Sequence, residues 1–114
     1  MDGNMENNLS TVYKNVEEIS QEWENLIIEL SDKEVDYYNL KEKYNGLSEN
    51  IIASTDFKEL YGKNNETVRK NHVKNELSDI VSELKTFEFS IDYLKRRISF
   101  LKAMTYVKMG SVDL

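Results

Sequence analysis

The sequence predicts an all-α protein: an antiparallel two-helix coiled-coil hairpin with a short helical connector. Three observations support this prediction. The 114 residues include no Pro and only four Gly, so little in the chain interrupts a helix. Both halves carry apolar residues at the heptad spacing of a coiled coil. Between them, the stretch ASTDFKELYGKNNETVRKNHV, Ala53–Val73, holds one Gly, two adjacent Asn and the single His.

The first helix is predicted over residues 8–50, after a flexible N-terminus at 1–7. Alternating steps of three and four meet an apolar or aromatic residue at every position except Lys33. The full series is Leu9, Val12, Val16, Ile19, Trp23, Leu26, Leu30, Lys33, Tyr37, Leu40, Tyr44, Leu47 and Ile51. SDKE at 31–34 has capping-box spacing, and NG at 45–46 is a turn dipeptide. The heptad phase continues through both, which favours one helix that is kinked at most.

The second helix is predicted over residues 66–108, before a C-terminal tail at 109–114. The same steps meet only apolar residues: Val73, Leu77, Ile80, Leu84, Phe87, Ile91, Leu94, Ile98 and Leu101. At about 1.5 Å per residue, each predicted helix is roughly 65 Å long. Two helices of similar length with matching seams and a short connector indicate an antiparallel hairpin within a single domain.

The connector, residues 51–65, is predicted to be a structured bend. Asp56 and Glu59 have the spacing of a capping pair, and Gly62 suits the left-handed position that ends a helical turn. Asn64 or Asn65 can then cap the second helix. The apolar residues of the short turn would close the end of the hairpin: Phe57, Leu60 and Tyr61.

A second interpretation makes this bend a recognition tip, because loops on rigid scaffolds often carry function. The sequence favours the purely structural bend over this alternative. The candidate tip residues are Asp56, Tyr61, Lys63, Arg69 and His72.

Charge is distributed unevenly between the halves. Residues 1–50 hold 12 acidic residues and 4 Lys, whereas residues 51–114 hold 9 acidic and 11 basic residues. An antiparallel hairpin would place the acids of the first helix beside the bases of the second, which favours that orientation. The acids are Glu17, Glu18, Glu22, Glu24 and Glu29, and the bases are Lys95, Arg96, Arg97 and Lys102.

Several classes of function find no support in the composition. Without Cys and with only His72, the chain lacks the residues of a usual transition-metal site, and we expect no metal and no cofactor. No nucleophile triad or glycine-rich phosphate loop is present, so we expect no catalytic residues and no enzyme. The net charge of −6 disfavours a general nucleic-acid binder. No apolar run approaches a membrane span, and the polar N-terminus is no signal peptide, so a cytoplasmic protein is expected.

Apolar side chains outside the two seams predict a binding surface. Such residues would stay exposed on an isolated hairpin, which favours either a homodimer that forms a four-helix bundle or docking of another protein. The preferred expectation is the homodimer, and the two can coexist. The candidate interface residues are Ile28, Val35, Tyr38, Phe89, Tyr93, Arg96, Arg97, Phe100 and Met104.

The segment YLKRRISFLK, Tyr93–Lys102, is the best candidate for contact with nucleic acid. Its basic and aromatic residues interleave, which could combine phosphate contacts with base stacking. Pairing of these bases with the acidic first helix is the favoured interpretation.

The segment DFKELYGKNNETVRKNHV at 56–73, followed by IDYLKRRISFLK, resembles small helical proteins of bacteriophages and prophages of low-GC Gram-positive bacteria. The resemblance covers about a third of the chain. It implies a small non-enzymatic effector in the host cytoplasm that modulates or inhibits another protein, such as a defence protein. An accessory protein of phage DNA replication or recombination is the alternative, and a structural coiled-coil spacer is a third.

Overall fold

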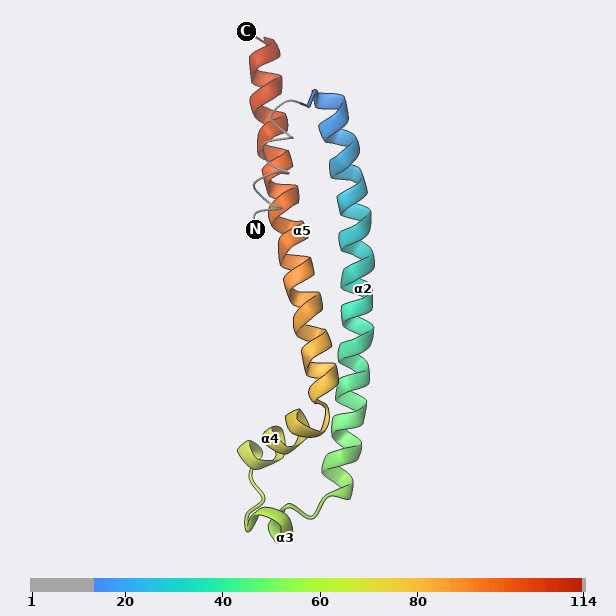
Figure 1. The fold of residues 1–114 in the computed structure, drawn as a ribbon, viewed down its shortest axis with the longest axis vertical. Coiled ribbons are helices and arrows are strands. Elements are labelled where there is room, and N and C mark those ends of the chain that lie inside the picture. Colours follow the sequence, from blue (N-terminus) through green and yellow to red (C-terminus); the bar gives the residue numbers. More distant parts are fainter. Residues whose placement is uncertain (1–13, 114) are drawn as a thin grey trace. The chain divides into compact units, whose positions relative to one another are not determined.

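The computed structural model describes residues 14–113, and it describes side chains for 14–110. These residues form four helices, with no strand among them: α2 (Val16–Ser54), α3 (Phe57–Tyr61), α4 (Glu66–Glu76) and α5 (Ser78–Asp113) (Figure 1). The predicted all-α class is therefore confirmed. The predicted flexible segment 1–7 and the seam positions Leu9 and Val12 lie outside the described residues.

α2 begins at Val16, after Lys14 and Asn15; residues 8–13 of the predicted helix lie outside the described residues. Asn15 precedes the helix and caps it, because its side-chain Oδ1 accepts from the backbone N–H of Glu18 at 2.8 Å. Glu18 Oε1 accepts in return from the N–H of Asn15 at 3.3 Å. This reciprocal capping box satisfies two backbone donors that a helix start would otherwise leave unpaired.

Beyond its start, α2 continues without a break to Ser54. It passes through 31–34 and 45–46, so the predicted continuity across both sites is confirmed. It also runs past the predicted end at residue 50. There the hydroxyl of Ser54 donates to the carbonyl of Asn50 at 2.8 Å, and that of Thr55 donates to Ile51 at 2.6 Å. The bond from Thr55 satisfies the Ile51 carbonyl, which is one of the last four carbonyls of α2 and lacks a helical partner.

The bend has the predicted turn chemistry. Asp56 Oδ1 accepts from the N–H of Glu59 at 3.1 Å and caps α3. Gly62 ends α3 with φ 76°, a left-handed conformation that costs a residue with a Cβ more than it costs Gly. Asn65 then caps α4 through a 2.9 Å bond from the N–H of Val68.

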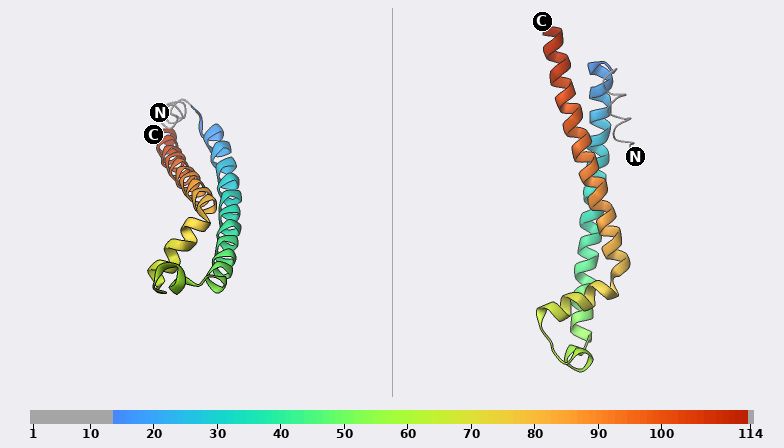
Figure 2. Two further views of the ribbon diagram at one scale, coloured as in Figure 1. Left: turned by 60° about the horizontal axis from the view of Figure 1, so that its bottom comes forward. Right: turned by 60° about the vertical axis from the view of Figure 1, so that its left-hand side comes forward.

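The second half departs from the predicted single helix at Leu77, where α4 ends and α5 begins. Figure 2 shows the two helices meeting at a bend. Leu77 has φ −109° and ψ 32°, yet its N–H bonds to Val73 at 2.9 Å and its carbonyl accepts from Val81 at 3.0 Å. The bend therefore keeps these flanking backbone bonds and needs neither Gly nor Pro. α5 extends to Asp113, so it includes most of the predicted tail.

The described residues belong to two compact units. The first contains 14–33 and 90–113, and the second contains 34–89. In the first unit, the start of α2 meets the later part of α5, as the ion pair of Glu22 with Arg97 shows. In the second, the hydroxyl of Tyr37 donates to Glu88 on the first part of α5 at 3.1 Å. Later residues of α2 thus meet earlier residues of α5, which confirms the antiparallel pairing.

The predicted seams form the packed faces of the helices. From Val16 to Ile51 and from Val73 to Leu101, every predicted seam residue is buried or half-buried. Ile19, Leu94 and Leu101 form the buried apolar core of the first unit, and Phe57 and Val73 that of the second. Burial of these side chains supplies the main driving force for packing.

Candidate functional site

A buried ion pair lies between α2 and α5 in the first unit. The guanidinium of Arg97, whose residue is only 6% exposed, donates from Nη2 to Glu22 Oε2 at 2.6 Å. Lys14 Nζ donates to the other carboxylate oxygen at 2.7 Å. The Arg97 guanidinium also lies over the ring of Phe100, 5.6 Å from its centroid. The contact between Glu22 and Arg97 links the two helix segments, and a shift in their register would separate these two charged groups.

The same contacts set the acidity of Glu22. Burial raises the pKa of its carboxyl, but the hydrogen bonds from Lys14 and Arg97, with their positive charges, outweigh burial and hold the pKa below its ordinary value. The carboxylate therefore stays ionised in the folded protein at mildly acidic pH. The ion pair is a structural element that links the two helices.

Glu22→Gln is expected to remove a pH-dependent part of the stability. A carboxyl whose pKa is lower in the folded than in the unfolded state stabilises the fold above the unfolded pKa. The wild type should therefore have the larger free energy of unfolding, and its difference from Glu22→Gln should be full above about pH 4.5. This difference should decline as the pH falls through the lower pKa of the folded state. Urea unfolding followed by circular dichroism at pH 7 and at pH 3 measures it. Glu24→Gln, at an exposed position of α2, is the control, and an advantage that grows towards pH 3 would contradict the expectation.

An aromatic cluster joins α3 to α4 in the second unit. The ring of Phe57 stacks on that of Tyr61 with centroids 6.3 Å apart, and it meets His72 edge-on at 5.3 Å. Tyr61 Oη and His72 Nδ1 are hydrogen-bonded at 2.5 Å. Two of the predicted tip residues, Tyr61 and His72, are therefore held in this cluster. The described residues contain no group of three or more His, Cys, Asp or Glu side chains that could hold a metal ion.

The other predicted tip residues are exposed or half-buried around the cluster. Asp56 caps α3, and Lys63 lies in the exposed loop between α3 and α4. Arg69 Nη1 donates to the side-chain oxygen of Asn64 at 2.7 Å. The tip is thus an ordered and locally basic region in which Asp56 and Arg69 also bind neighbouring loop groups.

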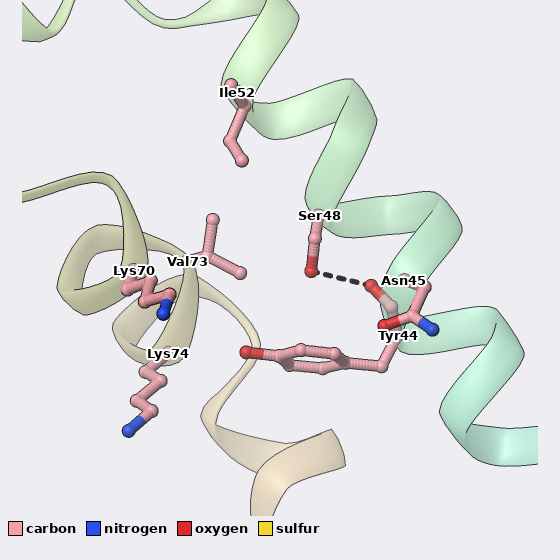
Figure 3. A pocket seen from close by; sticks show the side chains of 7 residues that line it. All are labelled: Tyr44, Asn45, Ser48, Ile52, Lys70, Val73 and Lys74. Carbon is pink, nitrogen blue, oxygen red and sulfur yellow. Dashed lines mark hydrogen bonds between the residues drawn. The ribbon is translucent and has the colours of Figure 1, made fainter. Parts of the chain in front are cut away.

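A groove opens beside the tip, between the end of α2 and α4 (Figure 3). Its volume is about 420 Å³. The lining residues come from two helices: Tyr44, Asn45, Ser48 and Ile52 from α2, and Lys70, Val73 and Lys74 from α4. The sequence predicted the seam residues Tyr44 and Val73 but not the groove. Lys70 and Lys74, four residues apart on one helical face, were the available signal for a basic edge.

The candidate interface residues on α2 and the start of α5 are exposed. Ile28, Val35 and Tyr38 each keep more than half of their surface in solvent, and Phe89 keeps 74%. By contrast, Tyr93, Phe100 and Met104 are half-buried. The structure therefore separates the predicted set into an exposed group and a group that packs within the first unit.

The two candidate arginines have partners within the chain. Arg97 is buried against Glu22, and exposed Arg96 donates to Asp92 on the same helix at 2.6 Å. The predicted match of acids on the first helix with bases on the second is realised for Glu22 and Arg97. Burial of Arg97 removes one of the four bases of segment 93–102 from the surface, which weakens this segment as a nucleic-acid site.

No family model, curated protein or solved structure matches this chain. Over the described residues, no helix is both long and apolar enough to cross a bilayer. Assignment of function must therefore come from the surface chemistry of the two units.

Proposed function

We propose that this protein is a non-enzymatic protein-binding module that modulates or inhibits its partner. The observation that carries the proposal is the pair of exposed apolar side chains Val35 and Tyr38, on the part of α2 that belongs to the second unit. Both lie on the side of α2 away from the seam, because each is displaced from it by a helical angle of about 100° or more. Large exposed apolar side chains that recur on one helix face are typical of protein interaction sites.

Helix faces of this kind suit binding rather than catalysis. Aromatic side chains such as Tyr38 and Phe89 offer a large contact area with few rotatable bonds, and aromatic residues are enriched among energetically dominant interface residues. The resemblance to phage-encoded helical proteins supports a bacterial protein as the partner. A second copy of this chain is the competing occupant of the same face.

The double substitution Val35→Ser/Tyr38→Ser is expected to abolish partner binding without unfolding the protein, because both side chains are exposed. Quantitative affinity capture from a bacterial lysate should recover a discrete protein with the wild type and at least about tenfold less with the variant. Asn39→Ser, at an exposed polar position of the same helix, should leave recovery unchanged.

Light scattering distinguishes the competing occupants. A mass of twice 13.4 kDa that returns to 13.4 kDa in the double variant would assign this face to a homodimer instead. Equal capture by the wild type and the double variant would refute the proposal.

A further inference from the structure

We propose that the groove between α2 and α4 binds an acidic segment of a partner protein that carries one bulky apolar side chain. The groove shares no residue with the exposed group Ile28, Val35, Tyr38 and Phe89, so this proposal does not rest on the one above. It also gives the basic tip a role beyond that of a structural bend.

The interior of the groove is suited to an apolar side chain. Figure 3 shows Val73 and Ile52 directed into the space between the helices, with the ring of Tyr44 along one side. Val73 is only 3% exposed and forms the base, whereas Ile52 remains accessible. The volume of about 420 Å³ lies within the range of roughly 300–1,000 Å³ that is usual for binding pockets. A bulky side chain placed here would leave water and contact apolar surface on both helices.

The edge of the groove is basic. Lys70 and Lys74 line it from successive turns of α4, and its lining includes no carboxylate. Lys70 pairs with Glu66 at 2.9 Å, but both side chains are about 70% exposed, so an incoming carboxylate can compete for the ammonium group. The hydroxyl of Ser48 is already engaged with the carbonyl of Tyr44 at 2.7 Å, and Lys70 and Lys74 are the charged groups of the lining.

The charge on the α4 side of the groove differs from that of the chain as a whole. Residues 63–74 carry four basic side chains and one acidic side chain, in a protein of net charge −6. At physiological salt, charges are screened beyond about 8 Å, so a short acidic peptide responds mainly to this local basic region. A long polyanion such as DNA would also meet the acidic remainder of the molecule, which favours a peptide over a nucleic acid.

The groove can contact one peptide segment in two ways, through its apolar interior and through its basic edge. An apolar side chain between Tyr44, Ile52 and Val73 would anchor the segment, and neighbouring Asp or Glu side chains would reach the lysines at the edge. The apolar contact would supply most of the affinity and the charges would select acidic sequences.

Selection from a random library of twelve-residue peptides displayed on phage tests the proposal with the intact protein as bait. The enriched peptides should combine a Phe, Leu or Trp with at least two neighbouring acidic residues. A synthetic peptide of the consensus, labelled with fluorescein, should bind with an affinity that falls as salt is raised. Replacing its acids by amides, or its bulky residue by Ala, should each weaken binding.

Matched variants locate the binding site. Lys70→Gln/Lys74→Gln should lower the affinity for the peptide by about tenfold. Lys85→Gln/Lys102→Gln, which removes the same charge from exposed positions of α5, should leave this affinity unchanged. Ser48→Trp, which fills the groove and leaves the charge unchanged, should block binding while circular dichroism shows an unchanged helix content. Three results would each overturn the proposal. The enriched peptides could lack acidic residues, or the two double-lysine variants could lose peptide affinity equally. The third is tighter binding of single-stranded DNA than of the peptide. Because Val35 and Tyr38 are not varied, failure here leaves the proposed function standing.

Discussion

Phe57→Ala will destabilise the second unit by about 3–5 kcal/mol, the usual cost of truncating a buried Phe. Phe57 is 1% exposed and contacts the rings of both Tyr61 and His72. Removing it leaves a cavity in the cluster that joins α3 to α4, and α3, with five residues, cannot persist without tertiary packing. We expect amide hydrogen exchange of α3 and α4 to accelerate strongly.

The neighbouring substitution Lys58→Ala provides the control, because Lys58 is exposed and belongs to the same short helix. Its effect should stay within about 0.5 kcal/mol. Hydrogen exchange of α4 that is equally fast in wild type and Phe57→Ala would show that the cluster does not hold α4. Such a result would also remove the support for an ordered tip and for the groove beside it.

Leu101→Ala will destabilise the first unit by about 2–5 kcal/mol. Leu101 has no exposed surface and belongs to the same small core as Ile19 and Leu94. The hydroxyl of the next buried residue on this face, Thr105, donates to the Leu101 carbonyl at 2.9 Å. A cavity at Leu101 thus removes apolar contacts from a core with few other buried side chains, and total stabilities of small proteins are only about 5–15 kcal/mol.

Urea unfolding monitored by circular dichroism measures this change. Lys102→Ala, one residue along α5 and exposed, should shift the unfolding free energy by less than about 0.5 kcal/mol. A loss below about 1 kcal/mol for Leu101→Ala would mean that the unit repacks around the cavity and that its interface is loosely specified.

These two substitutions separate stability from binding. Phe57 and Leu101 lie inside their units, whereas Val35, Tyr38 and Lys74 are exposed. Loss of partner or peptide binding in variants of the exposed residues, with unchanged unfolding free energy, would therefore report on the surfaces themselves. The same loss in Phe57→Ala would report on the positioning of α4.

The candidate sites were predictable only in part. Exposure of Ile28, Val35, Tyr38 and Phe89 follows from their positions outside the heptad seam, and the sequence identified all four. Arginine is usually exposed, yet Arg97 is buried. Its guanidinium is paired with Glu22 on the opposing helix. Sequence periodicity assigns a face to each residue, but it does not say which partner covers that face.

The sequence alone determined the helical class, the faces that pack and the chemistry of the bend. Heptad spacing decides which side of each helix is apolar, and local capping by Asp56, Gly62 and Asn65 depends on residues only a few positions apart. The tertiary structure decided the break at Leu77, the aromatic cluster and the groove. The cluster and the groove depend on contacts between different helices, which heptad spacing within one helix does not specify. At Leu77 the intrinsic helix preference is only a weak guide, because tertiary context can outweigh it.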